Sequence, residues 1–490
     1  MYRLEAASDD IYMASRAVLE GDMSSAMGLL TRALDSWQRS SDQAKLKLYL
    51  AACYSFSGKD GLNQAGSLLT EAKRHDPFIV SSPLYGAMSA LLAAYYQQKQ
   101  EDTIIRILKL PDHNDPLAAC IQLYALHLVK AYRVVLRYSA KLLKRCEMQP
   151  FYWRFLWWQA KAHQGLKHFD LAARDLEKAI ELAPQLSLVE LGLEHAQVLI
   201  KLGELSHALS RLEAIEQKLI LDKTENSEND KYQRLLSAKA EARLGNASKA
   251  LWLLKALEQE HFESELLHFE LRLELARNAR ELMQPSQAKN YYQETLKLAK
   301  ILLEPKEKFE LNYEYHQLLL ESGHPDDLLA AYNYLEELLS ANDYEVDSPE
   351  PEYVGRIYLD FAKASYRLGQ LSEAGYYAEA ALEQGFVFEA ALCLAQIAQD
   401  YYDLNLALDY YQMALSSTAR EMPAYGLCHA LIADTLVKQG YHHAERIFMH
   451  AEQGLECLAG HPLANIWQPL LSQYLLKARE QMSGATRLLN

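Results

Sequence analysis

A helical hairpin pattern that recurs along the whole chain is the feature that most constrains its fold. Its clearest copy runs from Trp153 to Pro184 and reads WRFLWWQAKAHQGLKHFDLAARDLEKAIELAP. Apolar residues return at three- and four-residue spacing on both sides of a short polar turn, which predicts two amphipathic helices. Ala160 and Ala172 are small enough to lie where these helices cross, and Ala179 follows on the same face. A hairpin of about 34 residues cannot bury its apolar face alone, so further copies must stack against it.

The sequence contains twelve copies of this hairpin. They can be aligned on one small or apolar marker residue near the start of the second helix of each copy. Their mean spacing is about 38 residues, and the clearest are the first, the fifth to the seventh and the tenth. A last helix, roughly Ile466 to Met482, is expected to cover the open end of the array. The twelve marker residues are Ala26, Ala65, Thr103, Val135, Ala172, Ala208, Ala250, Ala288, Leu328, Ala374, Ala407 and Ala444.

Two intervals between markers are long and contain polar segments. Residues 222–230 read DKTENSEND, and residues 342–352 read NDYEVDSPEPE, with two prolines and five acids. Such composition favours exposed turns or disorder over helix. We therefore expect residues 1–341 to form an array of about nine helix pairs, 342–352 to be a linker, and 353–490 to form a C-terminal block with a capping helix near 466–482. The acidic linker is either a solvated hinge or an autoinhibitory segment that occupies a basic groove.

Composition restricts the compartment and the kinds of partner. The chain has 490 residues and a formal net charge of −15, which disfavours a general nucleic-acid binder because phosphate neutralisation needs an excess of Lys and Arg. Its six cysteines are widely spaced without a Cys-x-x-Cys pair, a pattern typical of reduced thiols. The N-terminus lacks the apolar core of a signal peptide, and no apolar run approaches the ~18 residues of a membrane span. We expect a cytoplasmic protein.

The turns between the paired helices carry a family resemblance. The Gly-x-Leu-x-x-Ala turns with a trailing Ala, as at Gly203 to Ala208 and Gly369 to Ala374, resemble tetratricopeptide repeats, and so does the Ala…Pro pattern of 160–184. The resemblance spreads over nearly the whole chain. It implies an all-α fold, a right-handed superhelical α-solenoid of stacked antiparallel helix pairs. The spacing above 34 residues leaves armadillo- or HEAT-like geometry open locally.

In repeats of this kind the first helix of each pair lines a concave groove, which suits an extended peptide or a helix of a partner. Helical spacing from Trp153 predicts a basic, aromatic-flanked groove that receives an acidic or aromatic segment of a protein partner. The alternative is that Trp153, Trp157 and Trp158 fill gaps between helices. A clamp for a partner's C-terminal carboxylate is not supported, because the paired asparagines that it needs are absent. The predicted groove residues are Arg154, Trp157, Lys161, Lys201, Tyr232, Lys239 and Arg243.

Three other groups of residues invite a functional interpretation. We interpret the tyrosine pairs as packing residues of the repeats, with phosphorylation or ligand stacking as the alternative. His442, His443, Glu445 and His450 suggest a metal site, but adjacent histidines point to different faces of a helix, so a surface or partly buried role is favoured. The apolar residues of Ile466 to Leu476 form a candidate docking or self-association surface. The tyrosine pairs are Tyr95/Tyr96, Tyr291/Tyr292, Tyr376/Tyr377, Tyr401/Tyr402 and Tyr410/Tyr411.

Together these patterns predict a non-enzymatic protein–protein interaction scaffold or adaptor that uses no cofactor, binds no metal and has no catalytic residues. Phosphate-loop, His-Glu-x-x-His, Gly-x-Ser-x-Gly and dinucleotide-binding motifs are absent. The alternative is a peptide- or ligand-responsive regulator that switches a partner by changing superhelix curvature. RNA binding is a third hypothesis, which the acidity and the lack of a one-base-per-repeat code disfavour.

Overall fold

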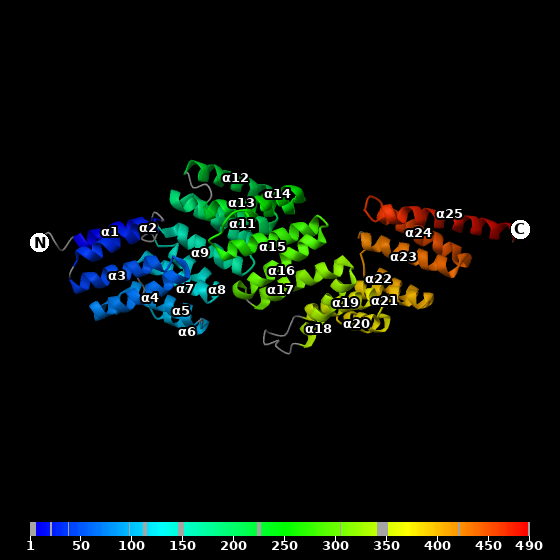
Figure 1. Ribbon diagram of the computed structural model, residues 1–490, viewed down its shortest axis with the longest axis horizontal. Coiled ribbons are helices and arrows are strands. Elements are labelled where there is room, and N and C mark those ends of the chain that lie inside the picture. The colour runs from blue at the N-terminus through cyan, green and yellow to red at the C-terminus, as the bar shows by residue number, and fades with distance from the viewer. Residues whose placement is uncertain are drawn as a thin grey trace. The chain divides into compact units, whose positions relative to one another are not determined.

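The computed structural model describes residues 6–19, 22–37, 39–97, 99–110, 115–145, 151–222, 227–303, 305–340, 351–419 and 422–488. These residues form α-helices joined by short turns, and no β-strand occurs among them. The chain divides into two compact units, residues 1–282 and 283–490, which are described separately. Figure 1 shows the order of the helices within each unit.

Unit 1 is a succession of helices in which each packs against the next. Single 3-10 turns at Pro77–Ser81 and Gln185–Ser187 precede α5 and α11. The helices are α1 (Ala6–Leu19), α2 (Met23–Ser36), α3 (Ser40–Tyr54), α4 (Gly58–His75), α5 (Pro83–Gln97), α6 (Gln100–Leu108), α7 (Pro116–Leu128), α8 (Tyr132–Leu142), α9 (Tyr152–Gly165), α10 (Phe169–Leu182), α11 (Leu188–Leu202), α12 (Leu205–Leu221), α13 (Glu228–Arg243), α14 (Ala247–Glu258) and α15 (Glu265–Glu281).

Unit 2 continues the same pattern, with a 3-10 turn at Tyr441–His443 before α24. Its helices are α16 (Pro285–Leu302), α17 (Pro305–Ser322), α18 (Pro325–Ser340), α19 (Pro351–Arg367), α20 (Leu371–Glu383), α21 (Val387–Asp400), α22 (Leu404–Ser416), α23 (Pro423–Gln439), α24 (Ala444–Leu458) and α25 (Ala464–Leu488). The predicted last helix, 466–482, lies within α25.

The predicted repeat register is confirmed. Each of the twelve markers lies in an even-numbered helix from α2 to α24, and eleven of them are at most 3% exposed. The twelfth, Ala444, is half-buried at the start of α24, where Ile447 is the buried residue. A small side chain at this position lets two helices approach closely. Both units are therefore α-solenoids of stacked antiparallel helix pairs, and the boundary between them falls inside the eighth predicted pair, between α15 and α16.

The turn between paired helices needs one residue in the left-handed conformation. Gly203 has φ 83°, and the following amide of Glu204 donates to the Leu199 carbonyl at 3.0 Å, which closes the end of α11. Lys167 takes the same position after α9 with φ 61°. A non-glycine residue there costs roughly 1–2 kcal/mol. This substitution explains why several repeats lack the glycine signature in the sequence.

The segment 222–230 begins at the end of α12 and ends within α13, and its residues 223–226 lie outside the described part of the chain. Residues 342–350 also lie outside it, and Pro351 begins α19. Helices on the two sides of that second segment share a core, since Leu335 of α18 packs with Ile357 and Phe361 of α19. The predicted hinge at 342–352 and the predicted block 353–490 remain predictions.

Within the described residues, no helix is long and apolar enough to cross a membrane. Five cysteines are free thiols: Cys53, Cys120, Cys393 and Cys428 are buried, and Cys457 is half-buried. Cys146 lies outside the described residues. Burial raises the pKa of the Cys53 and Cys120 thiols to about 12, so both stay protonated and unreactive at neutral pH.

Candidate functional site

The predicted groove residues lie on the first helix of successive pairs, α9, α11 and α13. Arg154 is the one among them that is buried. Its side chain is only 5% exposed and lies over the rings of Phe56 and Trp153, 5.2 and 4.7 Å from their centroids. One guanidinium nitrogen donates to the Val18 carbonyl, 3.2 Å away, in the last turn of α1. Arg154 therefore joins α9 to α1 inside the core, and no partner can reach it there.

Trp157 and Lys161, one turn apart on α9, both contact Glu194 of α11. The Trp157 indole nitrogen donates to one carboxylate oxygen at 2.6 Å, and the Lys161 ammonium lies 2.7 Å from the other. The same ammonium lies 4.6 Å from the centre of the Trp157 ring. Both side chains are half-buried. The two predicted residues are thus held together by a shared carboxylate and a cation–π contact.

A second ion-pair cluster joins α13 to α15. The Lys239 ammonium lies 2.6 Å from Glu270 and 3.8 Å from Glu274, which also contacts Arg277 at 3.2 Å. Tyr232 lies on the same face of α13, and burial together with the charges of Glu270 and Glu194 raises the pKa of its phenol. The Tyr232 hydroxyl therefore remains protonated and able to donate a hydrogen bond.

Lys201 and Arg243 lie between these two clusters, and both are exposed. The Lys201 ammonium lies 5.6 Å from the centre of the Phe169 ring, and burial of part of the side chain lowers its pKa while Glu270 opposes that shift. Arg243 donates to the Ile200 carbonyl in the last turn of α11 at 2.6 Å. Within the described residues, no carboxylate lies at ion-pair distance from either cation, so their charges are available to a partner.

Six of the seven predicted residues thus form one continuous surface on α9, α11 and α13. Glu194 of α11 and Glu270 and Glu274 of α15 belong to the same surface, because they pair with its lysines. We call this surface the first-helix stripe. It differs from the predicted groove in charge, because Glu194, Glu270 and Glu274 neutralise Lys161 and Lys239, and Lys201 and Arg243 are left as its unpaired cations. The stripe consists of Trp157, Lys161, Glu194, Lys201, Tyr232, Lys239, Arg243, Glu270 and Glu274.

The three tryptophans of this cluster differ in burial. Trp153 and Trp158 are 4% and 5% exposed and fill the core, whereas the half-buried Trp157 belongs to the stripe. The tyrosine pairs divide in a similar way. Tyr292 and Tyr411 are buried, but Tyr401 and Tyr402 are 57% and 88% exposed, so packing does not explain this last pair.

The histidines near the C-terminus do not lie together as a cluster of metal ligands. His450 faces His429 with their Nδ1 atoms 2.8 Å apart, and both rings are buried between α23 and α24. The rings of His442 and His443 lie 4.1 Å apart, tilted by 49°, in the turn before α24. No group of three or more His, Cys, Asp or Glu residues able to hold a metal ion occurs in the described part of the chain.

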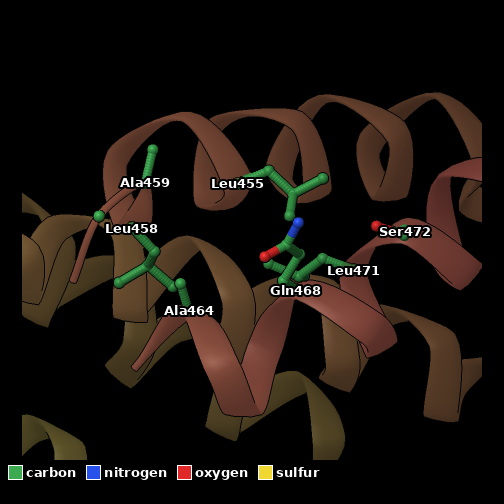
Figure 2. Close-up of a pocket in the computed structure, with 8 residues that line it drawn as sticks. Leu455, Leu458, Ala459, Ala464, Gln468, Leu471 and Ser472 are labelled. Atoms are coloured by element: carbon green, nitrogen blue, oxygen red, sulfur yellow. The ribbon is translucent and has the colours of Figure 1, made fainter. Parts of the chain in front are cut away.

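Hollows between helices are features that sequence reasoning missed. A cavity of about 620 Å³ lies among α10, α11 and α12, and one of about 490 Å³ lies among α20, α21 and α22. A third, of about 420 Å³, lies between α24 and α25 (Figure 2), where Leu455 lies near Gln468 and Leu471, and Leu458 lies beside Ala464. Within α25, Leu471 and Ala478 are buried, while Ile466 and Leu476 of the predicted docking surface are both 63% exposed.

No protein-family model and no curated protein matches the sequence. Solved structures do resemble it. A signal-transduction ATPase (STAND) protein with a tetratricopeptide repeat sensor from Pyrococcus horikoshii has 13% identity and a TM-score of 0.48 over 87% of this chain and 74% of that one. The Cut9–Hcn1 hetero-tetramer of APC/C has 12% sequence identity and a TM-score of 0.37, and the match covers 95% of this chain and 95% of that one. The human IFIT1 dimer with PPP-AAAA has 17% sequence identity and a TM-score of 0.42, and the match covers 89% of this chain and 94% of that one. The repeats of the chain resemble tetratricopeptide repeats, and these likenesses, all with TM-scores below 0.5, carry no argument about its partner.

Proposed function

We propose that this chain is a non-enzymatic protein–protein interaction scaffold and that the first-helix stripe of unit 1 binds a segment of its partner. The observation that carries the proposal is the stripe itself, in which an indole, a phenol and two unpaired cations lie on one face of three successive first helices. Trp, Tyr and Arg are the residues that most often anchor protein interfaces.

The chemistry of the stripe favours an acidic segment that also carries an aromatic side chain. A carboxylate of the partner would pair with Lys201 and Arg243, and an aromatic ring would pack between Trp157 and Tyr232. The existing ion pairs around Lys161 and Lys239 hold the stripe in shape before a partner arrives, which lowers the entropic cost of binding. The free, buried thiols support a reducing compartment such as the cytoplasm.

A charge reversal at Lys201 tests the proposal, because this side chain is exposed and has no carboxylate partner in the described part of the chain. Tagged full-length protein carrying Lys201→Glu would be used to capture partners from its own cells. Lys255→Glu is the matched control, since Lys255 is also exposed in unit 1 but lies on α14, outside the stripe. We expect the Lys201 variant to lose at least one partner that the Lys255 variant retains.

Retention of every partner by the Lys201 variant would contradict the proposed site. Loss of the same partners by both variants would show that net charge alone governs capture, and would also contradict it. If only the protein itself is recovered, the interaction-scaffold proposal fails, and small-angle scattering with added peptide would then test a ligand-responsive regulator.

A further inference from the structure

Each unit has a groove between the second helices of two neighbouring pairs, and the two grooves are equivalent in position but differ in their lining residues. In unit 1 the groove lies between α10 and α12 over α11, and in unit 2 between α20 and α22 over α21. Aligning the markers Ala172 with Ala374 and Ala208 with Ala407 makes the linings comparable position by position. Arg174 corresponds to Tyr376, Leu202 to Tyr401 and Arg211 to Tyr410. The same architecture thus presents a mixed-charge groove in unit 1 and a tyrosine-lined groove in unit 2.

The lining of the tyrosine-lined groove leaves its aromatic rings accessible. Tyr376 and Tyr401 are 67% and 57% exposed, and Leu406 is 41% exposed. Gly375 lies on the same wall, and a Cβ there would meet nothing within 4 Å, so the hollow is open beside the Tyr376 ring. Buried side chains of α21, among them Ile397, form its floor. Large exposed rings around a hollow of about 490 Å³ are typical of a docking site.

The charged residues that line this groove are of one sign. Residues 368–419, which span α20 to α22, contain no Lys, Arg or His. Glu379 and Asp403 line the groove itself. By contrast, the unit 1 groove places Arg174 and Arg211 among its carboxylates. The seven acidic residues of the stretch are Glu373, Glu379, Glu383, Glu389, Asp400, Asp403 and Asp409.

We propose that the tyrosine-lined groove of unit 2 binds an arginine-bearing segment of a protein partner. A guanidinium stacks on the face of a tyrosine and pairs with a carboxylate at the same time, and it is more weakly hydrated than a lysine ammonium. Tyr376 and Tyr401 supply the faces, and Glu379 and Asp403 supply the charge. Nucleic acid, acidic peptides and anionic membranes are repelled by this surface. The site is separate from the first-helix stripe and does not depend on the function proposed for it.

Fluorescence anisotropy of a labelled dodecapeptide of alternating Arg and Gly, titrated with the full-length chain, tests this site. We expect saturable binding that weakens about tenfold in Tyr376→Ala and in Tyr401→Ala, the loss of one guanidinium–tyrosine contact. Glu379→Gln should also weaken binding, and the effect of added salt should be smaller in that variant. The peptide with Lys in place of Arg should bind more weakly to the unaltered chain.

Tyr402→Ala is the matched control, because Tyr402 is 88% exposed and adjacent to Tyr401 but does not line the groove. This variant should bind the Arg peptide as the unaltered chain does. The proposal is overturned if the unaltered chain does not bind the Arg peptide, if Arg and Lys peptides bind equally, or if Tyr402→Ala weakens binding as much as Tyr401→Ala. Melting temperatures of the variants should be unchanged, since all these side chains are exposed. A Lys201→Glu variant should bind the peptide normally, which separates this test from that of the stripe.

Discussion

At the scale of single residues, Arg154 shows how a charge can be held inside a solenoid. Its stem and guanidinium pack against two aromatic rings, and its hydrogen bond satisfies a carbonyl at the end of α1. Arg243 on α13 and Arg367 on α19 are exposed, but they also donate to carbonyls near helix ends, those of Ile200 in α11 and Leu320 in α17. The last carbonyls of a helix have no partner within it and carry a partial negative charge, so a cation there is stabilising.

We predict that Arg154→Ala lowers the free energy of unfolding by about 2–4 kcal/mol, because it opens a cavity between α9 and α1 and removes the hydrogen bond to the Val18 carbonyl. Urea titration followed by tryptophan fluorescence measures the loss. Arg174→Ala is the control, since Arg174 is exposed on α10. Equal effects of the two substitutions would mean that Arg154 contributes nothing through its burial.

The buried histidines predict a pH dependence of stability. Burial lowers the pKa of four of them to about 4, below the ordinary value near 6.5 that the unfolded chain has. Between these values the unfolded chain binds more protons than the folded one, so stability falls as the pH drops from about 6.5 to 4. The four are His127, His195, His316 and His450.

His450→Asn should reduce the stability difference between pH 7 and pH 5 by about 2 kcal/mol, because it removes one such titration while the amide can still face His429. Urea titrations at the two pH values measure this difference. An unchanged difference would show that His450 does not remain neutral in the folded chain.

At the scale of helices and turns, small residues set the spacing between neighbours. Gly165 ends α9, and a Cβ there would lie 2.4 Å from the ring of Tyr132 at the start of α8. Gly28 lies within α2, and a Cβ there would meet nothing within 4 Å. The two glycines therefore serve different purposes although both lie in helices. Gly165 allows close packing of α8 against α9, whereas Gly28 only weakens α2.

We predict that Gly165→Ala destabilises the chain by about 1–3 kcal/mol through overpacking. Gly28→Ala should stabilise it by about 0.5–1 kcal/mol through helix propensity. Thermal unfolding followed by circular dichroism compares the two. If Gly165→Ala were also stabilising, α8 and α9 would not be in close contact at this position. Replacing Tyr132 by Leu in the Gly165→Ala chain should restore part of the loss.

The repeat register could be predicted because it depends on local sequence. A small or apolar residue every 32–46 positions, the extremes being Thr103 to Val135 and Leu328 to Ala374, was enough to place all twelve second helices. The charge of the stripe could not be predicted in the same way, because Glu194 and Glu270 reach their lysines across neighbouring helices. The burial of Arg154 depends on α1, 136 residues earlier in the chain. The tyrosine-lined groove did leave a signal, the absence of cations from residues 368–419.

At the scale of the whole molecule, two positions for a domain boundary can be compared. One is the boundary of the compact units, and the other is the linker predicted at 342–352. The division at Leu282 and Met283 leaves α16 to α25 together. A division at residue 341 would instead separate α18 from α19, which share buried side chains. Tyr332 of α18 also packs edge-on against Phe361 at 5.2 Å and donates to Glu373 of α20 at 2.5 Å. Cutting at 341 therefore exposes apolar surface that cutting at 282 keeps buried.

We predict that a fragment of residues 283–490 folds and that a fragment of residues 353–490 is less stable than it by about 3–6 kcal/mol, because Ile357 and Phe361 lose their cover. Chemical denaturation of both fragments measures the difference. Equal stabilities would favour the predicted boundary at 342–352 over the division at 282.

The interaction-scaffold account depends most directly on where a partner touches the chain. The measurement is site-specific photo-crosslinking in the cells of origin, with a benzophenone amino acid placed at position 201 in the first-helix stripe or at position 255 outside it. The account predicts a covalent adduct with one defined partner from position 201 and none from position 255. Adducts from position 255 alone, or the same adducts from both positions, would contradict it.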